Sequence, residues 1–107
     1  MSDDTETDEV IDDREGRRFV ILGSGERPAE LVYRINGERM LIVHTYVPDA
    51  DRGRGVAGRL MEAAVDQAGS EGLTIVPVCP YARYWLTAHP EEASDLTIDW
   101  KAYSSRT

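Results

Sequence analysis

The sequence contains only one cysteine, Cys79, and only two histidines, His44 and His89. A single cysteine excludes an intrachain disulfide and a multi-cysteine metal site, because both need at least two thiols. Two histidines could hold zinc only with carboxylates completing the coordination, and no ligand spacing of that kind is present. The sequence therefore predicts no metal site.

Long hydrophobic runs and extended basic clusters are also missing. The apolar stretch at residues 40–43 is far shorter than the roughly 20 residues of a membrane-spanning helix, and the N-terminus is acidic where a signal peptide would be basic. Only the short element with Arg52 and Arg54 concentrates positive charge, which is too little for a nucleic-acid footprint. We therefore expect a cytoplasmic protein that binds neither membrane nor nucleic acid.

Negative charge is concentrated at one end of the chain. The net charge is -8 over 107 residues, and residues 1–15 hold eight acidic side chains against a single arginine, so the rest is near neutral. A charge-dense segment with few apolar residues cannot bury enough surface to fold. We expect a disordered tail over residues 1–15 and one domain over residues 16–107, a usual size for a single folding unit.

The first half of that domain has the pattern of an antiparallel meander. Residues 18–22 and 29–35 are short β-rich runs separated by turn-forming residues. Asn36-Gly37 is a strong two-residue hairpin signal and leads into residues 38–47, where both faces of the expected strand are largely apolar. We predict that this third strand is central in the sheet.

The second half predicts a β-α-β crossover followed by a helix. From Val56 to Gly72, polar residues recur at helical spacing in an otherwise apolar segment, as expected for a helix packed deeply against a sheet. Residues 73–78 fit a buried parallel strand, and Pro80 is suited to begin a last helix that runs to Pro90. The fold class is therefore a small α/β sheet, with irregular structure expected after Glu91.

A glycine-rich loop from Arg52 to Gly58 joins the third strand to the first helix. Free N–H groups at a helix start, together with two arginines, favour a phosphate group. The loop matches the G-x-G-x-x-G dinucleotide fingerprint, but it follows the strand after five extra residues and no large doubly wound sheet follows. A Walker phosphate loop is excluded because no Gly-Lys-Ser/Thr is present. A further alternative is that the glycines only form a tight turn, with solvated arginines and no bound ligand.

Arg52, Gly55 and Ala57 also fit the pattern Arg-x-x-Gly-x-Ala, and here the sequence resembles the GNAT acetyltransferase superfamily. The segments His44 to Pro48, Cys79-Pro80-Tyr81 and His89-Pro90-Glu91 extend the resemblance to the small single-domain mini-GNAT group, over about residues 17–95. The resemblance implies a GNAT-like fold and an N-acetyltransferase that uses acetyl-coenzyme A as cosubstrate.

The same resemblance implies where the coenzyme binds. In GNAT proteins the strand before the phosphate loop diverges from the strand after the helix, and the pantetheine arm enters between them. The positions that correspond to the coenzyme contacts are Tyr46, Val47, Arg52, Arg54, Gly55, Val56, Ala57 and Gly58. The acetyl group would then point towards His44 and Cys79.

Candidate catalytic residues are Cys79, His44 and Tyr84. Cys79 precedes Pro80 at an expected helix N-cap, which favours a thiolate; it could accept the acetyl group or simply line the pantetheine slot. His44 could act as a base or be a hydrogen-bonded core residue. The resemblance implies an aromatic acid six residues after the cysteine, where this chain has Trp85, and the adjacent Tyr84 would point about 100° away.

The acceptor amine is not identifiable from the sequence, because so short a chain offers little substrate wall. Acetyl transfer to a protein, polyamine or other small amine is the first hypothesis. The alternative is a non-catalytic module that binds coenzyme A or a protein partner, and a homodimer could complete an open substrate site. A loop that binds no nucleotide would leave a small interaction domain.

Overall fold

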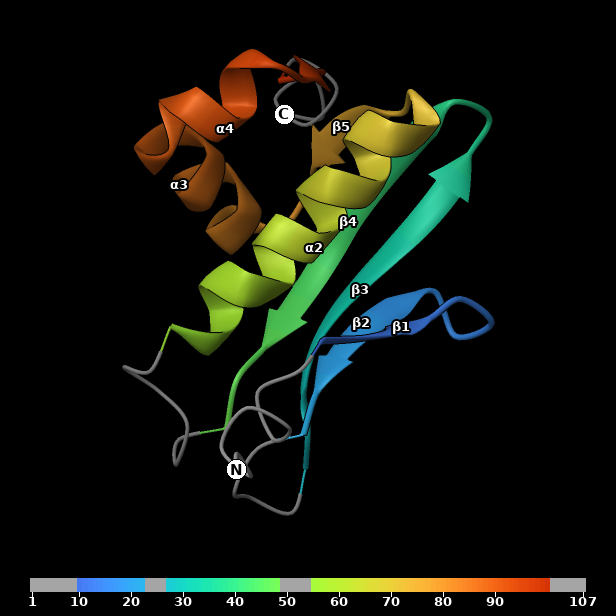
Figure 1. Ribbon diagram of the computed structural model, residues 1–107, viewed down its shortest axis with the longest axis vertical. Coiled ribbons are helices and arrows are strands. Elements are labelled where there is room, and N and C mark those ends of the chain that lie inside the picture. Colours follow the sequence, from blue (N-terminus) through green and yellow to red (C-terminus); the bar gives the residue numbers. More distant parts are fainter. Residues whose placement is uncertain (1–9, 23–26, 49–54, 101–107) are drawn as a thin grey trace.

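The computed structural model describes residues 10–22, 27–48 and 55–100 of the chain, which form a six-stranded sheet and three helices. The strands lie in the order β1-β2-β3-β4-β5-β6, so each strand neighbours the next one in the chain (Figure 1). Four antiparallel strands come first: β1 Val10–Asp13, β2 Arg18–Ile21, β3 Ala29–Asn36 and β4 Arg39–Tyr46. The parallel strands β5 Thr74–Pro77 and β6 Thr97–Ile98 complete the sheet.

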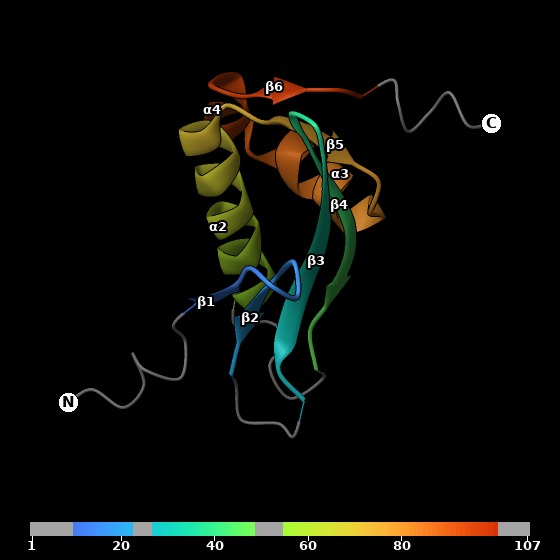
Figure 2. The same ribbon diagram turned by 90° about the vertical axis from the view of Figure 1, so that its right-hand side faces the viewer.

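Helix α2, Val56–Glu71, crosses from β4 to β5 and lies along one face of the sheet (Figures 1 and 2). Its expected polar stripe, Arg59, Glu62, Asp66 and Ser70, is exposed. The opposite side buries apolar residues, of which Leu60, Met61 and Ala64 are completely inaccessible to solvent. The predicted deep packing is therefore confirmed, and burial of a side chain such as Leu60 contributes roughly 1.5 to 3 kcal/mol.

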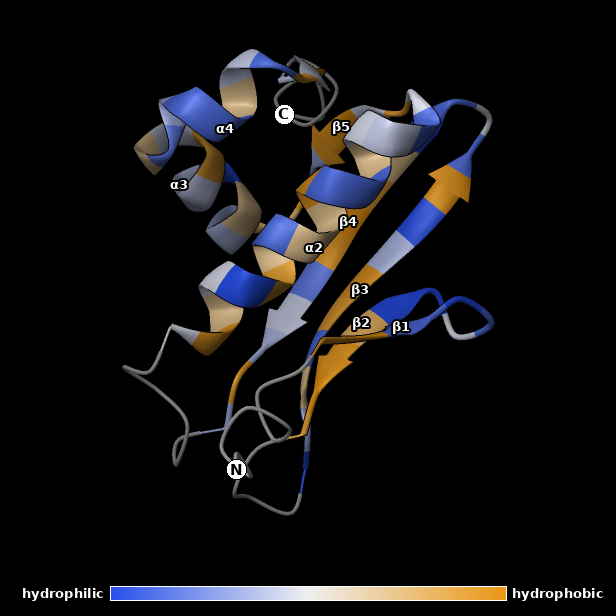
Figure 3. Ribbon diagram, in the orientation of Figure 1, coloured by the Kyte–Doolittle hydropathy of each residue, from blue (hydrophilic) through white to orange (hydrophobic). Residues whose placement is uncertain are grey.

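The hydrophobic core lies between α2, the α2-facing side of the sheet and helix α3, Pro80–Ala88. Figure 3 shows the apolar residues running along β2, β3 and β4, with hydrophilic residues at the turns. Leu31 of β3, Ile42 of β4 and Ile75 of β5 have no exposed surface. Trp85 and Leu86 attach α3 to the same core. This arrangement positions the start of α2 beside α3.

The tail prediction is wrong for residues 10–13, which form β1 instead of a disordered segment. Strand β1 pairs with β2, and Asp13 accepts hydrogen bonds from the Gly16 N–H and from the Arg18 guanidinium. The Arg14 guanidinium also pairs with Glu71 at the end of α2, at 2.6 Å. Strand pairing and ion pairs thus order a segment whose composition alone indicates disorder. Residues 1–9 lie outside the described residues.

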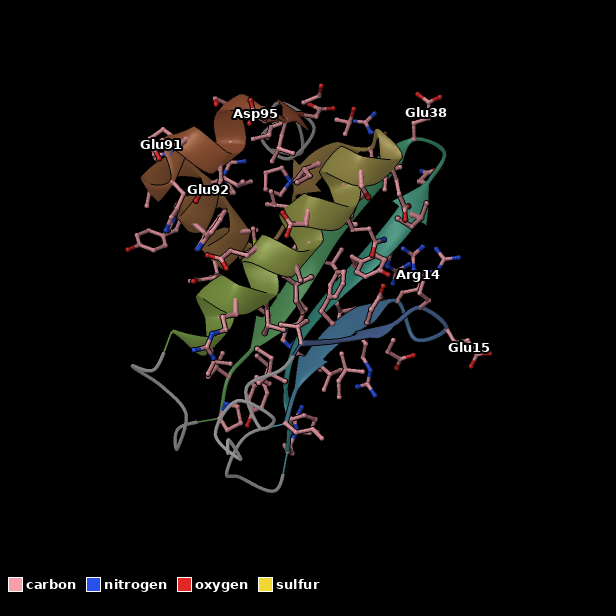
Figure 4. The ribbon with its side chains drawn as sticks, in the orientation of Figure 1. Arg14, Glu15, Glu38, Glu91, Glu92 and Asp95 are labelled. Atoms are coloured by element: carbon pink, nitrogen blue, oxygen red, sulfur yellow. The ribbon has the colours of Figure 1, made fainter. Side chains whose placement is uncertain are left out.

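The expectation of irregular structure after Glu91 is also wrong. A short helix α4, Pro90–Ser94, and strand β6 follow α3. Glu91 and Glu92 occupy the first turn of α4, where the helix dipole favours negative charge, and Asp95 follows the helix (Figure 4). Among the described residues, no helix has the length and apolar character needed to span a membrane.

Candidate functional site

The start of α2 has backbone N–H groups that lack an intrahelical acceptor. Gly55, the N-cap, has φ 76°, a left-handed conformation that glycine adopts without the usual side-chain penalty. The first turn contains no acidic residue, and Arg59 N is the first amide bonded to a carbonyl of this helix, that of Gly55. The N–H groups of Val56, Ala57 and Gly58 precede that bond and carry the positive end of the dipole. The geometry therefore favours an anion.

A gap in the strand ladder opens beside this helix start. The parallel pairing of β4 with β5 ends at Ile42 and Pro77, and Pro77 has no N–H to extend it. The Ile42 carbonyl accepts hydrogen bonds from Val78 N at 3.1 Å and Cys79 N at 2.9 Å, and the chain then turns into α3. Strand β4 continues to Tyr46 while paired only with β3. The two strands thus diverge beyond Ile42, as expected for a slot between them.

A β-bulge in β4 lies at the same point. Val32 of β3 pairs with His44 and Tyr33 pairs with Ile42, so Val43 is an extra residue without a partner in β3. A bulge of this kind bends the strand and increases its twist. The end of β4 is therefore directed away from β5 where the gap begins.

Cys79 lies at the divergence, as the N-cap of α3 with Pro80 at the first helical position. Its side chain is buried, with 7% exposure, and its Sγ lies 3.1 Å from Thr45 Oγ1. Sequence reasoning did not single out Thr45. The alternation of side chains along the strand could have indicated this residue. Thr45 pairs with the core residue Leu31, so its side chain lies on the side of the sheet that α2 covers.

His44 and Tyr46 occupy the other face of β4, because neighbouring strand residues point to opposite sides. His44 is exposed, whereas Tyr46 is partly covered by the Arg27 guanidinium, which lies 4.1 Å above its ring centroid. The structure therefore does not bring His44 together with Cys79 on one face. It leaves the imidazole accessible on the side that α2 does not cover.

The aromatic residues of α3 have different environments. Tyr84 is 65% exposed, whereas Trp85 is 2% exposed, as expected from their different angular positions on the helix. Tyr81 lies between these extremes, with its ring centroid 6.0 Å from that of Tyr84. Burial raises the pKa of the Tyr81 phenol, and the neighbouring Tyr84 and Cys79 raise it further when ionised. Tyr81 is thus a neutral hydrogen-bond donor at working pH.

His89 ends α3 and fixes the orientation of Trp85. Its Nδ1 lies 2.9 Å from the Trp85 carbonyl oxygen, and its ring stacks on the indole with centroids 4.0 Å apart. Pro90 then begins α4. These contacts give His89 a structural role at the end of α3.

Two of the predicted coenzyme contacts belong to the part of the loop before α2 that the structure does not describe. Arg52 and Arg54 lie outside the described residues, whereas Val47 is partly buried directly after β4. Within the described ranges, no group of three or more His, Cys, Asp or Glu side chains is arranged to hold a metal ion.

A hollow of about 670 Å³ lies at the other end of β4 and β5. It is lined by Glu38, Arg39, Thr74, Thr97, Ile98 and Asp99. Arg39 and Asp99 form an ion pair there. Two of its three charged side chains are thus paired with each other, and the hollow lies away from Cys79 and the helix start.

Comparison with known proteins identifies the family. The family model described as GCN5-related N-acetyl-transferase matches residues 18–96, which span the meander, α2, β5 and the α3 region. The chain belongs to the GCN5-related N-acetyltransferase family. The expected GNAT resemblance and fold class are thereby confirmed.

Individual relatives of this GCN5-related chain agree with that assignment. Protein NATD1 of Homo sapiens is 38% identical over 83 residues, covering 76% of this chain and 74% of NATD1. The chicken protein of the same name is 37% identical over 84 residues, covering 77% of this chain and 76% of its own length. A GCN5-like protein from Staphylococcus aureus, solved by NMR, superposes with a TM-score of 0.68 at 28% identity, covering 88% of this chain and 93% of that one.

Proposed function

We propose that this protein binds acetyl-coenzyme A at the start of α2 and transfers the acetyl group to an amine. The observation that carries the proposal combines two features: helix-start amides that lack an intrahelical partner, following a left-handed Gly55, and the divergence of β4 from β5. The amides suit the diphosphate, and the gap suits the narrow pantetheine arm. Family membership supports the same ligand.

In the proposed complex, the thioester reaches the divergence near Cys79 and Thr45. The α2 side of the sheet is filled by the core, so the amine approaches from the accessible face that carries His44. The neutral amine nitrogen attacks the thioester carbonyl, a C–N bond forms and the C–S bond breaks. The amine loses a proton, and the leaving thiolate gains one. His44 is the proposed acceptor of the amine proton.

The proposed donors on the helix side are hydroxyl groups. Tyr81 retains its proton because burial raises its pKa, so it can hydrogen-bond to the leaving sulfur. Tyr84 is the more exposed candidate and would act only if the bound ligands reach its side of α3. His44→Gln should lower the rate of amine-dependent transfer because the proposed proton acceptor is lost, whereas Tyr84→Phe should lower that rate less.

Cys79 is proposed as a wall of the slot, because its side chain is buried and its sulfur contacts the Thr45 hydroxyl. We expect Cys79→Ser to keep transfer within about threefold of wild type, since the small buried side chain is nearly preserved. Intact-protein mass spectrometry after rapid mixing with acetyl-coenzyme A should show no acetyl adduct on wild type. An adduct that is absent from Cys79→Ala would instead establish covalent transfer through the thiol.

Two measurements test the proposed function. Calorimetric titration with acetyl-coenzyme A should show saturable binding, and a thiol-release assay with lysine peptides and polyamines should identify the acceptor class. The matched blank contains acetyl-coenzyme A and protein without an amine. Absence of binding would overturn the proposal, whereas binding without amine-dependent release would leave the protein as a coenzyme-binding module.

A further inference from the structure

Two hollows flank the exposed side of α2 in its second half. One, of about 440 Å³, lies between α2 and the β1–β2 hairpin, and the other, of about 400 Å³, lies between α2 and the α4 region. Both are lined by Asp66 and Ser70, which are one helical turn apart on the same side of α2. Asp66 follows Gly55 by roughly 16 Å along the helix axis, so these hollows are separate from the helix start.

The hollow beside α4 has negative walls. It is lined by Asp66, Glu92 and Asp95, and no basic side chain of the described residues lines it. Glu92 lies in α4 and Asp95 directly follows that helix (Figure 4). Within the described part of the chain, none of these three carboxylates forms an ion pair. In the hollow beside β1, the cation Arg14 is already paired with two carboxylates. The two hollows together thus favour a positively charged ligand.

The buried side chain of Gln67 indicates that a hydrogen-bond donor belongs here. Gln67 lines the hollow beside β1 and is 8% exposed, and its Oε1 is buried without a hydrogen-bond partner among the described residues. The Ser70 hydroxyl donates to the Gln67 backbone carbonyl at 3.2 Å, so it does not serve the side-chain oxygen. Buried polar atoms normally have partners, and an unpartnered one costs stability that an apolar side chain would not cost.

The Gln67 oxygen can be presented to a ligand without a change of backbone. A half-turn about the last side-chain bond exchanges the amide oxygen and nitrogen, which have nearly the same shape. The Ser70 oxygen keeps its lone pairs, because its hydrogen is already donated. With the Asp66 carboxylate, this wall therefore presents acceptors that call for N–H donors.

Apolar surface lies beside these acceptors. Phe19 and Ala63 line the hollow beside β1, and Val65 and Leu96 line the hollow beside α4. A single metal ion does not fit this arrangement, because no group of three or more His, Cys, Asp or Glu side chains in the described ranges is arranged to hold one. The walls suit a flexible chain of methylene groups with cationic N–H groups at intervals.

We infer that the two hollows bind a linear polyamine across Asp66. One ammonium group pairs with Asp66 and donates to Gln67 Oε1, a second pairs with the Glu92 and Asp95 carboxylates, and the methylene segments pack on the apolar walls. Ammonium groups carry several donors and no acceptor, which complements walls that present acceptors. The inference does not rest on the proposed function, because the site lies along another part of α2 and involves no acetyl transfer.

The direct test is a ¹H–¹⁵N NMR titration of the whole protein with spermidine, in the absence of acetyl-coenzyme A. The chain has one glutamine and one asparagine, Gln67 and Asn36, so an Asn36→Asp variant assigns the two sets of side-chain amide signals. We expect the Gln67 signals to shift and saturate together with the backbone amides of residues 66–70 and 92–95. The Asn36 signals, at the β3–β4 hairpin, should stay in place.

Two neighbouring residues of α4 give a matched pair of charge variants. Glu92→Gln should weaken spermidine binding about two- to fivefold, because one exposed ion pair is lost. Glu91→Gln removes the same charge from the same helical turn, but Glu91 does not line the hollow, so affinity should be unchanged. Asp66→Asn combined with Glu92→Gln should weaken binding roughly tenfold. Equal spermidine affinities of the Glu91 and Glu92 variants would contradict the site.

Gln67→Leu tests the buried amide. The substitution nearly keeps the size of the side chain and removes the unpartnered oxygen, so the melting temperature of the free protein should rise. Spermidine binding should weaken roughly tenfold, through loss of one hydrogen bond to a charged donor. A glutamine that serves only packing would give a lower melting temperature and an unchanged spermidine affinity, which would overturn its role in the site.

Other occupants of the surface give different results. Equal shifts of the Gln67 signals with magnesium chloride would identify a diffuse counter-ion effect and overturn the inference. A trilysine peptide that saturates these residues when spermidine does not would assign the surface to a protein segment and overturn the polyamine site. Spermidine shifts confined to residues near His44 and Cys79 would place the polyamine at the acceptor site of the proposed function instead. If Gln67→Leu does not fold, the titration and the α4 pair still decide.

Discussion

The two ends of α2 differ although each is flanked by a left-handed glycine. At the C-terminal end, Gly72 N and Leu73 N both donate to the Ala68 carbonyl, so the chain caps its own helix. At the N-terminal end, Gly55 offers no side-chain cap and the first turn has no acidic residue. Arg14 of the β1–β2 turn also ties the C-terminal end through Glu71 (Figure 4). One end is thus closed by the protein's own caps, whereas among the described residues the other end has no side-chain cap.

The largest difference between the ends should appear when a negative charge is added to each. We expect Gly55→Asp to weaken acetyl-coenzyme A binding roughly 100-fold, about 3 kcal/mol, because the carboxylate would repel the phosphates at short range. Gly55→Asn has nearly the same shape and similar tolerance for the left-handed conformation, so it should lose much less affinity. Calorimetric titration of both variants gives the charge effect as their difference.

The control for this prediction lies at the opposite end of the same helix. Gly72→Asp and Gly72→Asn should have equal affinities for acetyl-coenzyme A, because that end faces its own caps. Equal affinities of Gly55→Asp and Gly55→Asn in folded protein would show that the helix start is not an anion site.

A second prediction concerns folding stability. Gly72→Ala should lower the free energy of unfolding by roughly 1 to 2 kcal/mol, because φ 69° is unfavourable for a residue with a Cβ. Gly69→Ala, inside the helix, should raise it by up to about 1 kcal/mol. Urea unfolding of the two variants compares them directly, and a stable Gly72→Ala would mean that the helix end readily adopts another conformation.

Alkaline pH should affect the end of the molecule near Cys79. The folded-state pKa of Tyr81 is raised, chiefly by burial, so the folded protein keeps a proton that the unfolded chain releases above about pH 10. Its contribution to stability is complete below that pH and declines as pH rises towards the folded-state pKa. Tyr81→Phe should therefore flatten the alkaline decline in melting temperature, and an identical decline in both proteins would contradict this assignment.

The smallest effect is expected in acid, at the β1–β2 turn. The Gly16 N–H bond, followed by Arg18, lowers the pKa of Asp13 in the folded state. The contribution of Asp13 is present above its unfolded pKa and is lost as pH falls through the lower folded-state value. Asp13→Asn should therefore lose slightly in stability at neutral pH and converge with wild type in acid. Parallel melting curves at all pH values would show that the turn contributes nothing through this carboxylate.

Local sequence signals predicted most of the secondary structure. The polar stripe and flanking glycines of α2 predict its course, because a helix on a sheet must bury one continuous apolar side. The Asn36-Gly37 signal correctly predicts the hairpin, but the paired residues are Asn36 and Arg39, so Gly37 and Glu38 form the loop. The register is decided by which strand residues enter the core, as Met40 and Ile42 do.

The sequence by itself determined the order of the elements from β2 to α3, the glycine-bounded helix and the family-specific motifs, since these depend on local conformation and residue pattern. Only the tertiary structure decided that Thr45 meets Cys79, that His44 lies on the other face, and that Trp85 Nε1 faces Gly58. It also decided that residues 10–13 join the sheet and that α4 and β6 follow α3. These features depend on strand register, a bulge and helix packing, which bring together residues that are far apart in the chain and that no local pattern relates.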